Sequence, residues 1–430
     1  MSQWSADKLN KHFKETGRSA LLHDIYGDEE DYQLALARIS GLLEKTEFEA
    51  THLFSAPGRT ELGGNHTDHN LGRVLCATVR QDTLAAVVGR DDGRIVIKSD
   101  GFPRTFSIDI SDLTLRPAEM GKTESLIRGV LAGIKESGGE AGGFSAEITS
   151  SVGVGSGLSS SASFEVLIGT IINSLYNDDR FGPEKIAQIG QFSENTYFGK
   201  PCGLMDQTAS AVGGILAIDF KDPENLVIKK IDHDFEKESY VLLVVNTGSS
   251  HADLTPAYAS IPHEMSGVAM EFGSEVLGMV DEQKFIQNIP LVRSKLGDRS
   301  VLRALHYYHE NKRVDQMVQA LQSEDIQSYL DIVRASGASS QNILQNAIPP
   351  NSDGKDQGLN LALGLSQLFF EEKGRGVARV HGGGFAGTIQ AYIHKEDLEE
   401  YMTHIKSILG EKAFQILNIR HHGATLISEL

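Results

Sequence analysis

The stretch that decides the fold is GVGSGLSSSASFEV, residues 153–166. Its closely spaced glycines let the backbone approach a ligand and point several N–H groups into one concavity. The serines that follow begin an apolar helix, where unpaired amides and the helix dipole favour a phosphate group. The run is not a P-loop, because no GK[ST] follows, and it lacks the GxGxxG spacing of dinucleotide-binding proteins. It predicts a phosphate loop; on the pattern alone, the alternative is a plain glycine–serine loop that caps a helix.

A second loop, APGRTELGGNHTDHNLGRVL (residues 56–75), crowds charged and polar side chains between glycines. Arg59 suits a phosphate group, whereas Asp, His and Asn side chains commonly hydrogen-bond the hydroxyls of a sugar. The alternative is a metal site, because His66, Asp68 and His69 are residue types that ligate Zn²⁺. No second ligand cluster with recognisable spacing accompanies them, so we favour a sugar and phosphate site.

Two more glycine-containing segments complete the pattern. In ENTYFGKPCGLMDQTASAVGG (residues 194–214), Asp206 lies in a glycine-flanked turn after a helix, where a carboxylate can accept a hydroxyl proton or hold a cation. A lone Asp in a turn is also a common helix cap. The segment HGGGFAGT (residues 381–388) is another loop that exposes backbone, with Arg379 nearby. One shared site for a phosphate donor and a sugar explains these loops together.

Composition and charge narrow the classes of partner. A chain of 430 residues is long enough for two or three domains or one large two-lobed enzyme. With 40 Lys and Arg against 58 Asp and Glu, the net charge of −18 disfavours a nucleic-acid partner. Only Cys76 and Cys202 are cysteines, which fits a reducing compartment. The polar first residues lack the apolar core of a signal peptide, and no stretch approaches the ~20 apolar residues of a membrane span. We therefore expect a cytoplasmic protein without nucleic-acid or membrane partners.

The coarse pattern is mixed α and β. Helical periodicity runs to about Glu49, and two strands, residues 84–89 and 94–99, flank the turn signal DDG, which predicts a hairpin. The polar segment KDPENLVIKKIDHDFEKES (residues 221–239) separates two strand-like runs. We place a domain boundary there, giving an N-terminal domain over 1–228 and a C-terminal domain over 229–430.

Taken in this order, the segments resemble those of the galactokinases in the GHMP small-molecule kinase superfamily. Residues 56–75 resemble the first family motif, 153–166 the phosphate-binding second motif, and 381–388 the third. Residues 194–207 are similar to the helix and turn that carry the catalytic aspartate. Residues 246–258, NTGSSHADLTPAY, resemble a sugar-side segment that ends in tyrosine.

The resemblance implies an α+β fold of two mixed α/β lobes, with ATP and sugar in the cleft between them. It assigns Asp206 as the catalytic carboxylate facing the C1 hydroxyl, with Arg59 beside it. The residues implied for the sugar are Asn65, His66, Asp68, Gly203 and Tyr258. Those implied for ATP are Gly153, Gly155, Ser156, Gly157, Leu158, Ser159, Ser160 and Ser161. Mg²⁺ would be positioned by Ser160 or Ser161 with Glu194.

The function that follows is an ATP-dependent, Mg²⁺-requiring sugar 1-kinase of the galactokinase type. Asn65 stands where the family usually has a glutamate associated with the C6 hydroxyl of the sugar, so Asn65 is predicted to set tolerance at C6. One alternative is therefore a kinase for a C6-altered sugar such as galacturonate. The other is a ligand-sensing regulator on the same fold that binds without turnover. The oligomeric state is not predicted.

Overall fold

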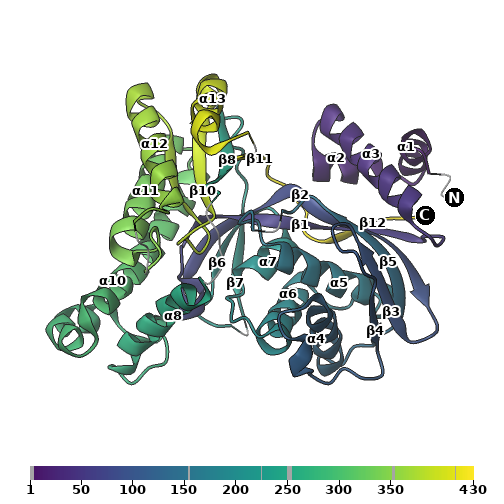
Figure 1. Ribbon diagram of the computed structural model, residues 1–430, viewed down its shortest axis with the longest axis horizontal. Helices are drawn as coiled ribbons and strands as arrows, with labels where there is room; N and C mark the ends of the chain where they lie inside the picture. Colours follow the sequence, from purple (N-terminus) through teal and green to yellow (C-terminus); the bar gives the residue numbers. More distant parts are fainter. Residues whose placement is uncertain (1–3, 154, 224, 249–253, 351–353, 412) are drawn as a thin grey trace.

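The computed structural model describes residues 4–153, 155–223, 225–248, 254–350, 354–411 and 413–430, and these are built around two β-sheets (Figure 1). The larger sheet runs in the order β12-β1-β2-β5-β3-β4, with β6 beside the first half of β2 and β7 beside β6. Its strands are β1 (His52–Gly63), β2 (Arg73–Arg90), β3 (Arg94–Ser99), β4 (Phe106–Asp109), β5 (Gly143–Ser150), β6 (Ile215–Asp219), β7 (Val227–Ile231) and β12 (Thr425–Glu429).

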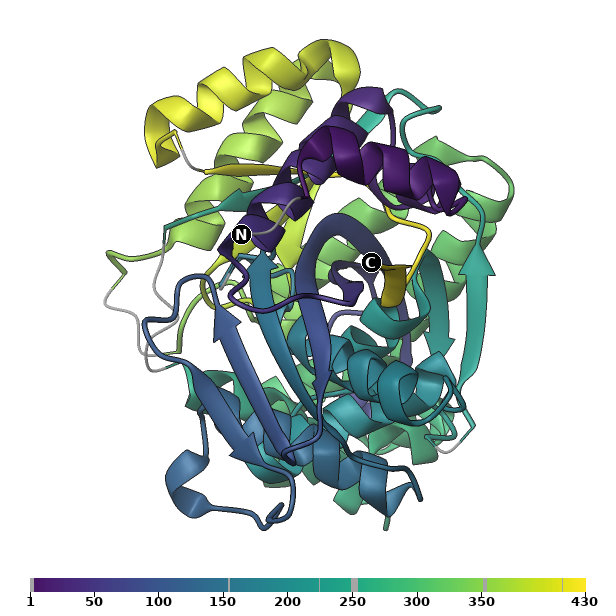
Figure 2. The same ribbon diagram turned by 90° about the vertical axis from the view of Figure 1, so that its right-hand side faces the viewer.

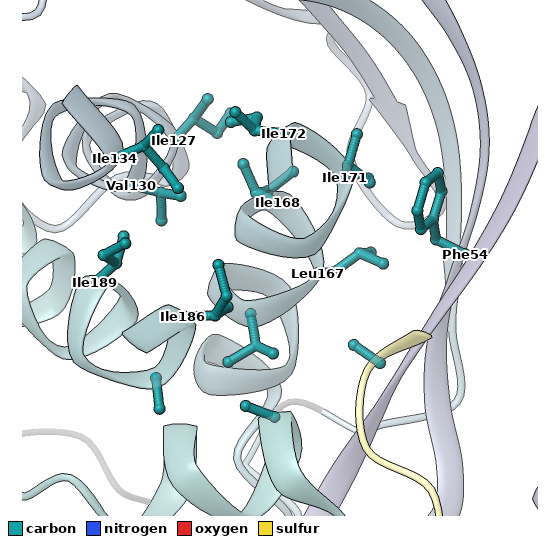
Figure 3. Close-up of a cluster of buried hydrophobic side chains, with 14 of the residues drawn as sticks. Phe54, Ile127, Val130, Ile134, Leu167, Ile168, Ile171, Ile172, Ile186 and Ile189 are labelled. Carbon is teal, nitrogen blue, oxygen red and sulfur yellow. The ribbon is translucent and has the colours of Figure 1, made fainter. Parts of the chain in front are cut away.

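Helices cover both faces of this sheet, because alternate residues of its strands point to opposite sides. Leu53 packs with α1 (Ala6–Glu15), α2 (Ser19–Tyr26) and α3 (Glu29–Lys45), whereas Phe54 packs on the other face. Figures 1 and 2 show α1–α3 laid over one face of the larger sheet and further helices packed on the opposite face. Those helices are α4 (Thr123–Glu136), α5 (Ser160–Tyr176), α6 (Pro183–Phe192) and α7 (Met205–Val212). Figure 3 shows apolar side chains of α4, α5 and α6 gathered in one buried cluster, with Phe54 of β1 at its edge.

The smaller sheet is fully antiparallel in the order β11-β8-β10-β9. Its strands are β8 (Tyr240–Asn246), β9 (Val377–His381), β10 (Thr388–His394) and β11 (Phe414–Leu417). One face carries α12 (Gly358–Lys373) and α13 (Leu398–Leu409), and the other carries α10 (Ile289–Gln322, interrupted at Gly297) and α11 (Ile326–Ser339). α8 (Thr255–Met270) and α9 (Glu282–Gln287) pack against α10. Because α10 also packs on β1 and β2, one core joins the two sheets.

The strand pairing corrects one expectation from the sequence, the hairpin, and bears on a second, the domain boundary. Residues 84–89 and 94–99 form strands but not a hairpin, because β5 lies between β2 and β3, antiparallel to the first and parallel to the second. The predicted domain boundary after residue 228 falls inside β7, which pairs with β6, and the C-terminal strand β12 pairs with β1 in the larger sheet. The two sheets therefore do not separate cleanly in sequence, and the division into domains stays a prediction.

None of the helices in the described part of the chain has the length and apolar character needed to cross a membrane.

Candidate active site

An ion pair between β1 and α7 forms the centre of the site. The register of β1 against β2 shifts between Pro57 and Arg59, and such irregularities re-aim the side chains that follow them. The Arg59 side chain is 9% exposed, and its Nε and Nη2 donate to Oδ1 and Oδ2 of Asp206 at 2.6 and 2.7 Å. Ser159 Oγ also donates to Oδ2 at 2.6 Å, and Arg59 Nη1 donates to the carbonyl of Gly157. The two predicted catalytic residues are thus in contact, and both are tied to the phosphate loop.

The same contacts set the charge of Asp206. Burial raises its pKa, but the charge of Arg59 and the hydrogen bonds from Arg59 and Ser159 outweigh burial, so the pKa lies below its usual range. The carboxylate is therefore ionised at neutral pH. Its Oδ2 accepts two hydrogen bonds and its Oδ1 accepts one, so Oδ1 keeps a lone pair for a further donor.

The phosphate loop leads into the N-terminus of α5. Gly155 and Gly157 have φ of 75° and 77°, and Ser159 has φ of 60° directly before the helix begins at Ser160. The first amides of α5 have no partner within the helix, which suits an anion. A Cβ at Gly157 would lie 2.7 Å from His381 Nδ1, so only glycine fits against the third motif. The side chain of Leu158, one of the predicted ATP contacts, is fully buried in the core.

Oxygen ligands lie beside this helix start. Glu194 sits in a π-helical turn, Ser193–Phe198, and is 3% exposed. Its Oε1 accepts hydrogen bonds from Ser161 Oγ at 3.2 Å and from Lys200 Nζ at 3.1 Å. A carboxylate and a hydroxyl are the hard oxygen donors that Mg²⁺ prefers, so the residues present fit the metal of Mg·ATP.

Asp68 and Gly203, two of the predicted sugar contacts, lie against each other. A Cβ at Gly203 would lie only 1.6 Å from Asp68 Oδ2, so the carboxylate rests against the glycine backbone. Burial, and next the negative charge of Asp206, raise the pKa of Asp68. The two carboxylates therefore lie near each other, with Asp206 held by Arg59 and Asp68 held against the backbone.

The two histidines of the second loop form a chain of hydrogen bonds. Asn70 Nδ2 donates to His69 Nδ1 at 2.8 Å, so a neutral His69 donates from Nε2 to His66 Nδ1 at 3.3 Å, and His66 donates from Nε2 to Gly383 O at 3.0 Å. Burial lowers the pKa of His66 to about 3 and that of His69 to about 4. No group of three or more His, Cys, Asp or Glu that could hold a metal occurs within the described ranges.

The triple-glycine loop receives three side chains of the predicted sugar site. Asn65 Nδ2, His66 Nε2 and Tyr258 Oη donate to the carbonyls of Gly382, Gly383 and Gly384 at 2.7, 3.0 and 3.0 Å. Asn65 and His66 follow β1 and Gly382–384 follow β9, so the bonds of Asn65 and His66 connect the larger sheet to the smaller one, while Tyr258 reaches the same loop from α8. Part of the sugar-side segment 246–258 lies outside the described residues.

Asn65 is the predicted sugar contact whose placement differs most from expectation. It is fully buried, and its Nδ2 also donates to Glu61, while its Oδ1 accepts from Asn346 at 2.9 Å and from Ser340 at 3.3 Å. Glu61 in turn pairs with the buried Arg379. Because every polar atom of the amide has a partner inside the protein, Asn65 has no free donor or acceptor in this structure for the C6 end of a sugar.

The sequence matches two family models and several known proteins. The family model for the GHMP kinases N terminal domain matches residues 125–214, and the galactokinase galactose-binding signature matches residues 45–88. A galactokinase of Lacticaseibacillus casei (strain BL23) is 30% identical over 377 residues, 86% of this chain and 93% of that protein. A galactokinase of Streptomyces coelicolor is 32% identical over 349 residues, 79% and 84% of the two chains. The chain belongs to the galactokinase family.

Solved structures support the same fold. The Lactococcus lactis galactokinase complexed with galactose superimposes with a TM-score of 0.74 at 22% identity, covering 95% of this chain and 99% of that one. The Methanococcus jannaschii mevalonate kinase gives 0.60 at 14% identity, over 86% and 98% of the chains. The expected GHMP kinase fold and the resemblance to galactokinases are confirmed, and the chain is a sugar kinase of this ATP-using family.

Sequence reasoning missed several residues that the structure brings to the site of this galactokinase-family chain. Gln207, Glu165 and Lys200 all surround Glu194. Each lies inside a segment quoted above, and Gln207 directly follows Asp206. Their only signal in the sequence was that they lie close to the predicted site residues. No spacing rule relates a helix residue such as Glu165 to a turn about forty positions later.

Proposed function

We propose that this chain transfers the γ-phosphoryl group of ATP, taken as Mg·ATP, to the C1 hydroxyl of galactose. The observation that carries the proposal is the Arg59–Asp206 pair, which is hydrogen-bonded to the phosphate loop through Gly157 and Ser159 and lies near Asp68 on the sugar side.

In this proposal, Asp206 orients the acceptor hydroxyl. Its Oδ1 accepts a hydrogen bond from the C1 hydroxyl, which aims the oxygen lone pair at the γ-phosphorus. The lowered pKa of Asp206 makes it a weak base, so it takes the proton late, as the new O–P bond forms. This suits phosphoryl transfer, whose transition state is loose and depends mainly on positioning and charge neutralisation. Arg59 contributes a fixed positive charge beside the transferred group.

The phosphate loop and Glu194 hold the donor. The free amides at the start of α5, with the hydroxyl of Ser160, would bind the phosphate oxygens. Ser161 and Glu194 would hold Mg²⁺, which when bound neutralises charge on the β- and γ-phosphates. Lys200 is already paired with Glu194 and adds a second positive charge at this edge.

Galactose is the acceptor that the placement of Asn65 supports. A C6-carboxylate sugar was attractive only because Asn65 replaces an expected glutamate, and Asn65 offers no free donor or acceptor to a ligand. Asp68 is then the main acceptor for sugar hydroxyls, with the backbone of Gly203 beside it. We also propose a cytoplasmic location, consistent with two free cysteines, of which Cys76 is buried.

The test is ADP formation from ATP and Mg²⁺ with galactose, galacturonate, galactosamine, arabinose and glucose, followed by phosphorus NMR of the product. Galactose should give the highest kcat/KM, and its product should carry phosphate at C1. Faster turnover of galacturonate would instead favour the C6-altered alternative, and ligand binding without ADP formation would favour the sensor.

A further inference from the structure

A buried amide lies directly behind the carboxylate proposed to hold Mg²⁺. Gln207, on the first turn of α7, is 0% exposed, and its Nε2 donates to Glu194 Oε2 at 2.9 Å and to Glu165 Oε2 at 3.1 Å. The sulfur of Cys202 lies 3.7 Å from the same nitrogen. Both N–H groups of the amide are therefore directed to carboxyl groups.

The three donors to Glu194 differ in freedom. Ser161 and Lys200 bond its Oε1, but Ser161 is half-buried and the Lys200 side chain is 60% exposed. Either donor can rearrange when a charged ligand arrives. Gln207 bonds the other oxygen, Oε2, and it does so from a fully buried position. The orientation of the Glu194 carboxylate is therefore set mainly by the buried amide of Gln207.

Packing leaves Gln207 little alternative. A Cβ at Gly190 of α6 would lie 3.1 Å from Gln207 Cγ and 3.4 Å from Glu165 Cβ, so this glycine makes room for both side chains. Among the described residues, Oε1 of Gln207 and Oε1 of Glu165 meet no hydrogen-bond donor. The amide is therefore oriented by its two carboxyl partners and by nothing on its oxygen side.

We propose that Gln207 is a positioning residue for the metal side of the reaction, holding Glu194 in the direction needed to bind the Mg²⁺ of the nucleotide. The inference rests on the proposed function. It gives neighbouring residues of one helical turn two tasks: Asp206 points to Arg59 and the acceptor, and Gln207 points to Glu194 and the donor. Residues that orient a metal ligand from behind typically change metal affinity by about 10–100-fold when replaced.

The variant Gln207→Met keeps the length of the side chain and removes both donors. Its matched control is Gln191→Met on α6, because Gln191 donates to Cys202 O at 3.2 Å from the same neighbourhood without bonding Glu194. Calorimetry would measure ADP binding with Mg²⁺ and in EDTA, and Mn²⁺ EPR would measure metal bound to the ADP complex. We expect Gln207→Met to weaken Mg·ADP and Mn²⁺ binding about tenfold or more. ADP in EDTA, galactose affinity and the Gln191→Met control should stay within about twofold.

Two results would overturn this role. One is unchanged Mn²⁺ and Mg·ADP affinity; the other is an equal loss of ADP affinity with and without metal. Gln207→Asn, which keeps the amide but shortens it, provides a second variant; if neither variant folds, Gln207 serves the fold and not the metal, and the proposal also falls. Because these readouts are binding constants, they are independent of the sugar panel, whose failure would reject the proposed function alone.

Discussion

Replacing Asp206 by Asn removes one charge from the centre of the site with little change in shape. The Asn oxygen can still accept one hydrogen bond from Arg59, but its NH₂ group would face the other N–H of the guanidinium, together with the hydroxyl of Ser159 if it replaces Oδ2. Loss of the oriented acceptor should lower kcat by about 10²–10⁴-fold. Galactose and ATP should still bind within about tenfold, because the change removes neither the carboxylate of Asp68 nor any backbone amide of the phosphate loop.

The same change should destabilise the fold. Removing one partner of a fully buried ion pair costs about 3–5 kcal/mol. The Asp206 side chain is 29% exposed, so water can solvate the unpaired charge in part and reduce this cost. We therefore expect the free energy of unfolding to fall by about 1–3 kcal/mol. Urea unfolding of both proteins at neutral pH would measure the difference.

The pH dependence has a definite sign. The folded-state pKa of Asp206 is lowered, so its contribution to stability is present above the ordinary Asp pKa of about 3.9 and disappears as pH falls through the lower folded value. The stability gap between wild type and Asp206→Asn should therefore be constant from about pH 8 to 5 and narrow below about pH 4. Near-normal kcat in the variant, or a wild-type acid limb near pH 6–7 that belongs to Asp206, would refute the reasoning.

Three other changes test the sugar and metal sides. Asn65→Glu should lower the free energy of unfolding by about 3 kcal/mol or more, because it buries a second carboxylate beside Glu61. If the variant instead keeps its thermal stability and changes the galactose-to-galacturonate ratio of kcat/KM, the buried placement of Asn65 is wrong. Gly203→Ala should raise the KM for galactose at least about tenfold by displacing Asp68, and an unchanged KM would show that the carboxylate is not a sugar contact. Ser161→Ala should raise the Mg²⁺ and ATP requirement while leaving galactose affinity, measured by calorimetry, unaltered.

The sequence predicted the parts of the site that depend on local chemistry. Glycines in positive-φ turns and a helix that begins with serines are readable from residue types, and so is a carboxylate close to glycines, although the structure places Asp206 in the first turn of α7. These segments do meet around Arg59. The predicted hairpin failed for the opposite reason. Residues 91–93 can connect two strands tightly whether or not those strands pair with each other. β2 and β3 are not neighbours because β5, which starts fifty residues later, lies between them.

Asn65 illustrates what a resemblance between motifs leaves out. Its position in the loop matches a sugar-contacting residue of the family, but its surroundings come from Glu61, Arg379 and Asn346, two of them about 280 or more residues away in the chain. Buried polar groups must be satisfied by partners wherever the fold supplies them. The role of such a residue is therefore fixed by long-range packing, which one motif does not encode.

The contacts that make Asp206 reliable in position also make it a poor base. Arg59 and Ser159 hold both carboxylate oxygens, and that same stabilisation of the anion lowers the pKa. An enzyme that needed early proton removal would gain from the reverse arrangement, with a pKa raised toward neutrality. Phosphoryl transfer through a loose transition state places little demand on the nucleophile's charge and a large one on its direction. The Arg59–Asp206 pair therefore lowers the basicity of Asp206, which this reaction needs least. The same contacts align the acceptor oxygen with the phosphate loop, because Arg59 is hydrogen-bonded to Gly157 of that loop and Ser159 belongs to it.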